Sequence, residues 1–406
     1  MRDLFFSLSY NLLTRLILLI ISILSVKLLT IAEYGELSYI LVIVGTLAII
    51  SLFGGGTAVN RSYSIAKKEN SFELSNQIFL FNILISLIVS VVLLLISIFF
   101  IANLNIAIFT FLIFMFMSLN SILEGAMYGL GKYRQLAINS SIIFMLSIPL
   151  GYFLILSYKV NGALLAILLY RIILLVLNLI SISSFKIIKL SNLSKVIKNK
   201  EVLISFKEVS LPVFLGALLV APVMLILVTL LKNTPNGINE IAYFSWNNQI
   251  YTLAIFIPSI LTGFIISKMS ANTEDAKEKL IKYIKYNFIF GILISIILFL
   301  IKPFLLGWAG NDYIENGNDS YNIMLLTILL YCLNSAFGSY WVSINKAKIG
   351  LLINLIWAIS VLTFCFYTID IKPYSFTLYN SLLVGYLLIF LAQIIFCFMN
   401  KDEVGE

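Results

Sequence analysis

Three ionisable residues lie inside long apolar stretches of the sequence, where charged side chains are rare. Arg15 lies roughly 16 Å along the apolar run 5–30, and Arg171 lies roughly 14 Å past Gly162 in another run, at about 1.5 Å per helical residue. Glu124 lies in a third run. If these runs cross a membrane, a charge at mid-depth costs about 2.5–3.5 kcal/mol and needs a water-filled cavity or a partner of opposite charge.

The two arginines suit an anionic ligand, because a guanidinium group presents a planar fork of donors that binds phosphate oxygens in pairs. We therefore expect Arg15 and Arg171 to line a central, water-filled cavity and to bind an anion there. Glu124 is expected either to balance one arginine or to carry a coupling proton. Two alternatives stay open: Arg15 reaches toward the cytoplasmic surface, and Glu124 forms a structural ion pair with Arg15 or Lys132.

Three consecutive amides and two prolines complete the set of candidate residues. Asn247, Asn248 and Gln249 are adjacent in an apolar run, so at least one of them must point toward the interior. We predict that these amides contact the substrate. Pro212 and Pro222 share another run, where each removes a backbone hydrogen bond and favours a kink. This pattern predicts a bendable gate, with ordinary helix packing as the alternative.

The sequence lacks the residues that several classes of site require. The sequence has no histidine, which removes the commonest metal ligand and general base. We therefore expect no metal, no cofactor and no catalytic residues. The absence of a G-x-x-x-x-G-K-[ST] motif means that the chain is not an ATP-driven pump by itself. The three cysteines lie in apolar runs and are expected to be buried as small hydrophobic side chains. They are Cys332, Cys365 and Cys397.

The elements that must position these residues are membrane-spanning helices. Of the 406 residues, 61% are hydrophobic and 11% are charged, whereas soluble domains carry about 25% charged residues. Because a span needs about 20 largely apolar residues, we predict an all-α integral membrane protein with twelve transmembrane helices. The twelve runs are 5–30, 37–53, 78–102, 106–128, 136–157, 162–184, 208–231, 242–266, 284–306, 321–343, 349–369 and 376–399.

The basic residues predict the orientation of the spans. With the N-terminus in the cytoplasm, twenty of the 27 lysines and arginines fall in cytoplasmic segments and five fall outside. This excess follows the positive-inside rule, so the N- and C-termini are both predicted to be cytoplasmic. It also explains the net charge of +8. Because the basic residues are scattered over separate loops, we expect no nucleic-acid binding.

The longest basic stretch divides the chain into two halves of six spans each. We expect an N-terminal lobe over residues 1–184, a cytoplasmic basic linker over 185–207, a C-terminal lobe over 208–399 and a cytoplasmic tail over 400–406. Internal duplication is common in transporters, and their sites tend to lie between the repeats near the middle of the membrane.

Several short motifs occur in order along the predicted spans. They are EYGELSY at 33–39, FGGGTAVNR at 53–61, YGLGKY at 128–133, SLP at 210–212, IAYFS at 241–245 and the segment 306–313. In the order and spacing of these motifs the chain resembles, over nearly its whole length, the polysaccharide-unit flippases. These are the Wzx-type O-antigen transporters of the multidrug/oligosaccharidyl-lipid/polysaccharide exporter (MOP) superfamily.

The resemblance implies two six-helix lobes that face each other around a central cationic cavity. It implies that an undecaprenyl-pyrophosphate-linked oligosaccharide is moved from the cytoplasmic to the periplasmic leaflet of the bacterial inner membrane. Transport would use alternating access coupled to an H+ or Na+ gradient, with membrane lipids and a polysaccharide polymerase as further partners. The family shares no strict site motif, and the second lobe here has no charge at mid-span, which puts a symmetric cationic site in doubt.

Two other functions are compatible with the same spans. A drug or cation antiporter of the same superfamily prefers a carboxylate-lined cavity, for which Glu124 alone is thin support. A membrane polysaccharide ligase or polymerase usually has a large external loop, whereas the longest external loop here covers only residues 307–322. We therefore predict a flippase rather than an enzyme.

Overall fold

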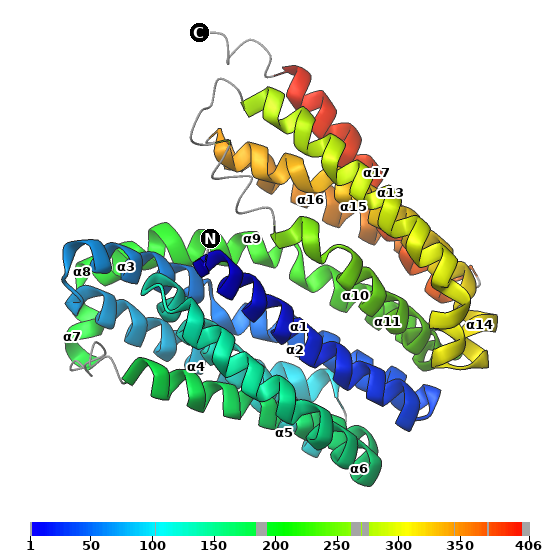
Figure 1. The fold of residues 1–406 in the computed structure, drawn as a ribbon, viewed down its shortest axis with the longest axis horizontal. Coiled ribbons are helices and arrows are strands. Elements are labelled where there is room, and N and C mark those ends of the chain that lie inside the picture. Colours follow the sequence, from blue (N-terminus) through cyan, green and yellow to red (C-terminus); the bar gives the residue numbers. More distant parts are fainter. Residues whose placement is uncertain are drawn as a thin grey trace. The chain divides into compact units, whose positions relative to one another are not determined.

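The protein is helical throughout the part of the chain that the structure describes. The computed structural model describes residues 2–101, 103–183, 193–260, 269, 276–344, 346–371 and 373–399 (Figure 1). Ten helices in these ranges are long and apolar enough to cross a membrane. The predicted all-α, multi-span class is therefore confirmed, while the cytoplasmic location of the termini stays a prediction.

The helices pack into two compact units, Met1–Pro222 and Val223–Glu406. The first unit contains α1 (Arg2–Leu28), α2 (Ile31–Leu52), α3 (Gly55–Glu69), α4 (Glu73–Phe100), α5 (Leu104–Gly129), α6 (Tyr133–Ser183), α7 (Leu193–Lys198), α8 (Lys200–Ser205), the π-helical turn η1 (Phe206–Ser210) and α9 (Leu211–Leu218). Helix α10 (Ala221–Lys232) crosses the boundary. The second unit contains α11 (Gly237–Ala254), α13 (Ala276–Ala309), α14 (Asn311–Asn316), α15 (Asn318–Ser343), α16 (Ala347–Thr368) and α17 (Tyr374–Met399).

The lobes and linker expected from the charge pattern divide the chain at a different place from the two packing units. The linker was placed at 185–207, between spans six and seven, whereas the packing boundary falls within span seven. Residues 185–192 and the predicted tail 400–406 lie outside the described residues. The two six-helix lobes, the basic linker and the tail therefore stay predictions.

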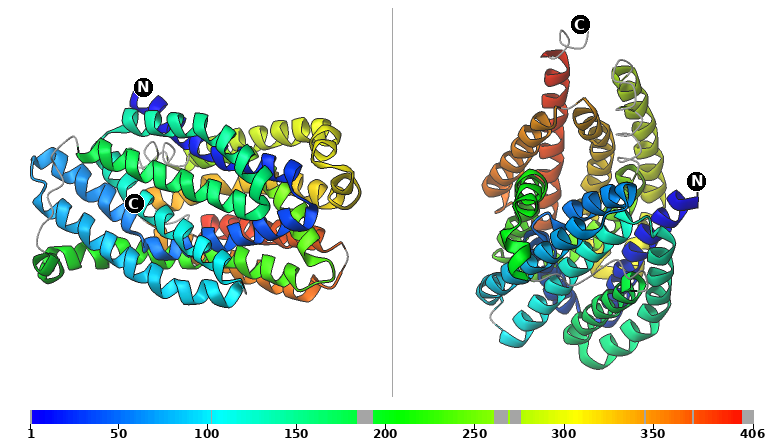
Figure 2. Two further views of the ribbon diagram at one scale, coloured as in Figure 1. Left: turned by 90° about the horizontal axis from the view of Figure 1, so that it is seen from below. Right: turned by 90° about the vertical axis from the view of Figure 1, so that its left-hand side faces the viewer.

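Helix α6 is a hairpin of two spans. At Lys159 the backbone (φ 52°, ψ −128°) leaves the helical region. The Nδ2 atom of Asn139 donates a hydrogen bond to Oδ1 of Asn178 at 2.9 Å. These two residues lie almost equally far from Lys159 along the chain, so the chain reverses there and the two arms run antiparallel (Figures 1 and 2). The predicted spans 136–157 and 162–184 correspond to these arms.

A second short turn joins α4 and α5. The side-chain oxygen of Asn103 accepts hydrogen bonds from the backbone N–H groups of Asn105 and Ile106, which caps the start of α5. Across the two helices, Oγ of Ser86 donates to Oγ of Ser118 at 2.9 Å. The third and fourth predicted spans therefore form an antiparallel helical hairpin.

The total of twelve spans stays a prediction. The ten candidate helices become eleven when the two arms of α6 are counted separately. The remaining predicted span, 242–266, begins within α11, and residues 261–266 lie outside the described part of the chain.

The end of α2 bends sharply before α3. Phe53 (φ 49°) and Gly54 (φ 72°) both adopt the left-handed conformation at this point. A Cβ atom added to Gly54 would overlap the backbone oxygen of Ser210, so glycine is required by both conformation and space. The ring of Phe53 stacks on that of Phe214, with centroids 3.8 Å apart. The first half of span seven is therefore packed on the α2–α3 bend, within the first unit.

Gly125 and Gly129 allow α5 to pack directly against α3. A Cβ atom added to Gly125 would overlap the backbone oxygen of Gly56, and one added to Gly129 would lie 2.5 Å from the backbone oxygen of Asn60. Small residues four apart commonly permit such close approach between membrane helices. The position of α5, which carries Glu124, is thus fixed by contact between two backbones.

Span seven is interrupted at two places. The π-helical turn η1 precedes α9, and residues 219–220 separate α9 from α10. Pro212 lies in the first turn of α9, and Pro222 lies in the first turn of α10. A proline lacks the N–H group that would continue the preceding helix. The two prolines therefore lie beside interruptions of the span, while their role as a gate stays a prediction.

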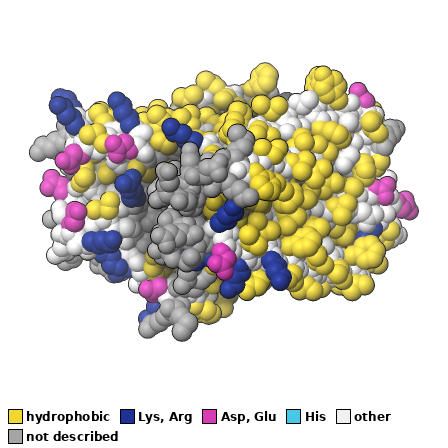
Figure 3. All heavy atoms as spheres, turned by 90° about the horizontal axis from the view of Figure 1, so that it is seen from above, with side chains coloured by type: hydrophobic (Ala, Val, Ile, Leu, Met, Phe, Trp, Pro, Cys, Tyr) yellow, Lys and Arg dark blue, Asp and Glu magenta, His cyan; other side chains and the backbone are white. Residues whose placement is uncertain are grey.

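Apolar side chains cover much of the outer surface. Phe99 is 85% exposed, Met145 is 74% exposed and Leu95 is 71% exposed. On the face drawn in Figure 3, hydrophobic side chains form broad continuous areas, and charged side chains gather beside them. Contiguous apolar surface of this kind indicates contact with lipid.

We expect the substitution Gly125→Ala to destabilise the protein by about 1–3 kcal/mol, because the new Cβ atom must push α3 away from α5. Gly45→Ala is the matched control. Gly45 lies within α2, and a Cβ atom added there meets nothing within 4 Å, so its improved helix propensity should slightly raise stability. Thermal unfolding of the purified protein in detergent measures both variants. Equal unfolding temperatures would contradict the close packing of α3 and α5.

Candidate functional site

A group of polar side chains lies inside the first unit, where α1, α5 and α6 meet. Hydrogen bonds, ring contacts and charge interactions connect its members. We call this group the inner polar cluster. It consists of Tyr10 and Asn11 from α1, Asn120, Glu124 and Tyr128 from α5, and Tyr170 and Arg171 from α6. The structure thus brings together two of the ionisable residues identified in the sequence, Glu124 and Arg171.

Arg171 occupies the middle of its span. It lies twelve residues after Lys159 and twelve residues before Ser183, the last residue of α6. It is therefore roughly 18 Å from either end of this arm, at about 1.5 Å per residue. The side chain is only 8% exposed. This position agrees with the mid-depth location expected from the sequence.

The guanidinium group of Arg171 contacts its neighbours but keeps one donor unused. Its Nη1 donates to the hydroxyl of Tyr170 at 3.4 Å, and its central carbon lies 4.6 Å from the centroid of that ring. Nδ2 of Asn120 donates to the backbone oxygen of Arg171 at 2.8 Å. Among the described residues, Nε of Arg171 and Oδ1 of Asn120 are buried without a hydrogen-bond partner. Because such atoms are costly to bury, they mark a place where water or a ligand completes the site.

Glu124 lies beside Arg171. Its carboxylate is within hydrogen-bonding reach of the Tyr10 hydroxyl and interacts with the positive charge of Arg171. On the next turn of α5, the hydroxyl of Tyr128 accepts from Nδ2 of Asn11 at 3.1 Å, and its ring meets that of Tyr10 edge-on at 6.1 Å. The charge of Arg171 therefore acts on Glu124, while the role of Glu124 as a balancing charge or as a proton carrier stays a prediction.

Lys132, which the sequence offered as another partner of Glu124, lies in the turn between α5 and α6. It follows Gly131, whose φ of 72° is left-handed. Burial and, to a smaller extent, the neighbouring charge of Lys67 lower the pKa of the Lys132 ammonium below its ordinary value. Lys132 therefore lies in the turn at the end of α5, and its pairing with Glu124 stays a prediction.

Arg15 lies on the face of α1 that also carries Asn11. Residues four apart in a helix share a face, and Asn11 contacts Tyr128 of the inner polar cluster. The side chain of Arg15 is half-buried. The hypothesis that Arg15 and Arg171 bind one anion together stays a prediction.

The three consecutive amides belong to the second unit. Asn247 is fully buried, and its Nδ2 donates to the backbone oxygen of Gly317 at 3.1 Å and to Oγ of Ser320 at 2.8 Å. These bonds tie α11 to the start of α15. Asn248 and Gln249 are half-buried. One amide therefore points inward as expected, while contact of these three residues with a substrate stays a prediction.

Within the described residues, no group of three or more cysteine and carboxylate side chains is placed to hold a metal ion. Cys332 and Cys365 are buried, as expected from their apolar surroundings, whereas Cys397 is only partly buried. The expectation of burial is thus wrong for Cys397, which lies near the end of α17.

Tyrosines are the buried polar residues that the sequence did not identify. In the second unit, the hydroxyl of Tyr251 donates to that of Tyr386 at 3.2 Å, and the ring of Tyr331 lies edge-on to both at 6.1 and 5.8 Å. All three tyrosines lie near the middle of predicted spans rather than at their ends. That position was the available signal, because aromatic residues usually concentrate at the membrane interfaces.

Solved structures share this arrangement of helices. The chain matches the inward-facing conformation of a multidrug resistance MATE family transporter of the MOP superfamily, with a TM-score of 0.80 at 14% identity, over 98% of this chain and 95% of that chain. It matches the outward-facing conformation of a MATE family transporter with a TM-score of 0.70 at 16% identity, over 99% and 95% of the two chains. The chain has the MATE-like fold of the MOP superfamily.

A third structure with this MOP fold is a Pyrococcus furiosus transporter whose binding pocket is described as having reverse polarity, suggesting a different function. It matches with a TM-score of 0.71 at 16% identity, over 100% of this chain and 96% of that chain. No protein-family model matches the chain, and no curated protein matches it in sequence. The likeness therefore concerns the MOP fold and does not specify a substrate.

Within this MATE-like fold, we expect Glu124 and Arg171 to be energetically coupled. Glu124→Gln leaves Arg171 without its counter-charge, and removing one partner of a buried pair costs about 3–5 kcal/mol. The double variant Glu124→Gln/Arg171→Met removes both charges and should recover much of that loss. Thermal unfolding of the wild type, both single variants and the double variant gives the coupling free energy. Strictly additive losses would show that the two residues act independently.

Proposed function

We propose that the protein is an alternating-access transporter that flips an undecaprenyl-pyrophosphate-linked oligosaccharide from the cytoplasmic to the periplasmic leaflet of a bacterial inner membrane. The MATE-like fold supports transport. The observation that carries the choice of substrate is Arg171, a buried guanidinium at mid-depth with one unused donor. A charge held in the middle of a span marks a functional site by default.

The chemistry around Arg171 fits an anion that bears sugars. The unused Nε can donate to a phosphate oxygen, for which the arginine fork is well shaped. The unpaired Oδ1 of Asn120 lies on the neighbouring helix and can accept from a sugar hydroxyl. Tyr170 adds an aromatic ring beside the guanidinium group. The polyprenyl tail needs no polar site, because it stays in the bilayer.

Glu124 links substrate binding to a proton in this proposal. In the free protein its carboxylate interacts with the charge of Arg171. A pyrophosphate group that binds Arg171 competes for that charge, and the carboxylate then favours its neutral, protonated form. Glu124 therefore takes up a proton when the anion binds and returns it when the anion leaves, so that the protonation of Glu124 is coupled to the occupancy of the site.

Pro212 and Pro222 provide the bendable gate in this proposal. Pro212 lies in the first turn of α9, just after the π-helical turn, and Pro222 lies just after the break at residues 219–220. Each interruption lacks the continuous hydrogen bonding that stiffens an ordinary helix. Span seven can therefore change its bend at these points while the helices on either side keep their shape.

A drug or cation antiporter is the second candidate function. It is favoured by the match to a structure described as a multidrug resistance MATE family transporter and by the carboxylate of Glu124 within the first unit. Uptake of a cationic dye into inverted vesicles separates the two functions. Dye uptake that depends on Glu124 and an ion gradient would support the antiporter over the flippase.

We expect Arg171→Met to reduce surface polysaccharide at least tenfold in a cell that lacks its own flippase. A lost charge-assisted hydrogen bond is worth about 1.5–3 kcal/mol, and 1.4 kcal/mol corresponds to a factor of ten. Arg171→Lys should fall between the wild type and Arg171→Met, because it keeps the charge but loses the planar fork. Polysaccharide on the cell surface is measured relative to the amount of protein in the membrane.

Arg134→Met is the matched control for this experiment, because Arg134 is exposed at the start of the same helix. It should leave polysaccharide display near the wild-type level. Full polysaccharide display by a well-expressed Arg171→Met variant would show that Arg171 does not bind the substrate. The knockout also separates a flippase from a polymerase, since loss of a polymerase leaves single repeat units on the surface and loss of a flippase leaves none.

We expect Pro222→Ala to slow transport severalfold without lowering the unfolding temperature, because an N–H group at this position favours continuation of α9 into α10 and stiffens span seven. Pro149→Ala is the matched control, since Pro149 lies inside an uninterrupted stretch of α6. The polysaccharide assay and thermal unfolding measure both variants. Transport at the wild-type rate in Pro222→Ala would show that bending at this break is not needed.

A further inference from the structure

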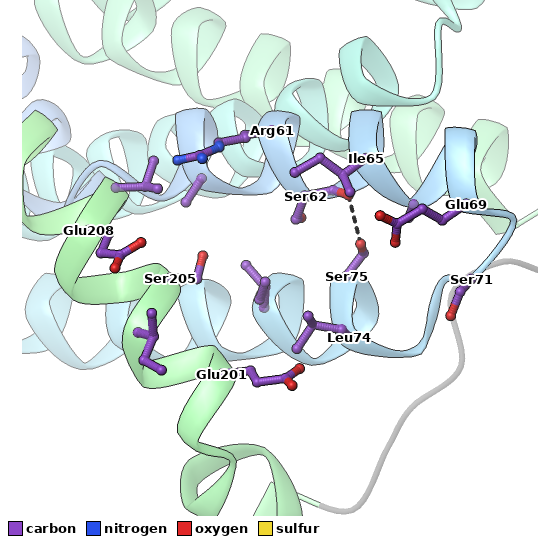
Figure 4. Close-up of a pocket in the computed structure, with 15 residues that line it drawn as sticks. Arg61, Ser62, Ile65, Glu69, Ser71, Leu74, Ser75, Glu201, Ser205 and Glu208 are labelled. Carbon is purple, nitrogen blue, oxygen red and sulfur yellow. Dashed lines mark hydrogen bonds between the residues drawn. The ribbon is translucent and has the colours of Figure 1, made fainter.

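A second polar site lies in the first unit, away from the inner polar cluster. It is a cavity of about 390 Å³ between the α3–α4 hairpin and the segment formed by α8 and η1 (Figure 4). Glu208 and Ser205 project into it from the η1 and α8 side, and Ser75 projects from α4 (Figure 4). None of these residues takes part in the proposed transport mechanism.

The cavity lies at the level where two spans leave the membrane. One candidate span begins at Glu73 and another begins at Lys200. Leu74 and Ser75, in the first turn of the former, and Glu201, in the first turn of the latter, all line the cavity. The polar ends of membrane helices lie among lipid headgroups. The cavity therefore opens where a phospholipid headgroup is always available.

The floor of the cavity offers hydrogen-bond acceptors. Ser62 is 9% exposed and Ser75 is 3% exposed. Oγ of Ser62 donates its proton to the backbone oxygen of Val59, and Oγ of Ser75 donates its proton to the backbone oxygen of Ser62, both at 2.9 Å. A hydroxyl that has used its proton can only accept. The floor therefore selects a ligand that donates hydrogen bonds.

The charged groups around the cavity are unequal in number. Three carboxylates line it, from Glu69, Glu201 and Glu208, together with one guanidinium group, from Arg61. In a chain with a net charge of +8, this is a local excess of negative charge. It attracts a cationic group, while the single arginine can hold one phosphate.

The mouth of the cavity is apolar. Ile65, Leu74 and Ile204 line it and are 45%, 36% and 52% exposed. They come from α3, α4 and α8, and Leu74 and Ile204 belong to two candidate membrane spans. A ligand with a polar head and hydrocarbon chains matches both parts of the site.

We infer that this cavity binds a phospholipid whose headgroup carries both a primary ammonium and a phosphate. The ammonium donates to the carboxylates of Glu201 and Glu208 and to the serine floor, and the phosphate binds Arg61. The acyl chains lie along Ile65 and Ile204. An anionic headgroup without an amine is disfavoured by the carboxylates, and a trimethylated amine has no N–H group for the acceptor floor.

The test uses native mass spectrometry of the full chain released from micelles. The micelles contain equal amounts of phosphatidylethanolamine, phosphatidylcholine and phosphatidylglycerol with identical acyl chains. We expect the phosphatidylethanolamine adduct to exceed each of the others about tenfold. Equal or stronger binding of phosphatidylglycerol or phosphatidylcholine would overturn the inference, and this comparison needs no variant.

Substitutions then locate the site. The double variant Glu201→Gln/Glu208→Gln should lower the amount of bound phosphatidylethanolamine to that of bound phosphatidylcholine. Arg61→Gln should lower the binding of both lipids by the same factor. Glu315→Gln is the matched control, because Glu315 is an exposed glutamate in the second unit. Retained selectivity in the double variant, with an unchanged unfolding temperature, would place the lipid elsewhere. Displacement of the lipid by an equal concentration of soluble glycerophosphoethanolamine would show a site for a soluble amine and overturn the lipid assignment.

Discussion

The first unit depends on keeping a guanidinium group neutralised and solvated by protein atoms in the middle of a membrane-spanning helix. Arg171 meets this constraint through the charge of Glu124 and the ring and hydroxyl of Tyr170, while Nδ2 of Asn120 donates to the backbone oxygen of Arg171. These partners come from α5 and α6, while Tyr10 of α1 holds the carboxylate from the other side. Separation of any of these helices would leave a charge without its partner in an apolar medium, which is strongly unfavourable. The same interactions that would bind a substrate therefore hold three helices together.

Close backbone packing supplies the rigid frame for this cluster. Gly125 precedes the ring of Tyr128 by less than one turn and lies against Gly56. Because α5 cannot move away from α3 without losing this contact, Glu124 is held at a fixed distance from the bend between α2 and α3. That bend in turn carries the first half of span seven through the stacked rings of Phe53 and Phe214. A shift of α5 or of the first half of span seven can thus be transmitted to the other through the bend between α2 and α3.

Much of the fold follows from the sequence because the bilayer imposes simple rules. The apolar runs predicted a separate span on each side of Asn103 and of Lys159, and counting residues placed Arg171 at mid-depth. The partner of Glu124 did not follow, because sequence position gives depth in the membrane but not the rotation of each helix about its axis. Arg15, Arg171 and Lys132 were all reachable on that basis, and it is the packing of α5 against α6 that brings the charge of Arg171 near Glu124.

The tyrosines show a second limit of the sequence. Tyr10, Tyr128 and Tyr170 lie more than forty residues apart from one another along the chain, and nothing local indicates that they meet. A tyrosine is ordinary both at a membrane interface and inside a helix bundle. The cavity beside α8 could not be found from the sequence for the same reason, since its carboxylates and serines are ordinary residues singly and come together only where α8 and η1 pack near α3 and α4.

The boundary between the two units has a consequence for how such a chain could have arisen. Doubling of a six-helix ancestor would place the seam between spans six and seven, yet the rings of Phe206 and Phe214 at the start of span seven are packed on Phe53. The second half of the chain therefore lends its opening segment to the first half. A cut of the chain between spans six and seven would therefore leave Phe53 without the two rings that stack on it.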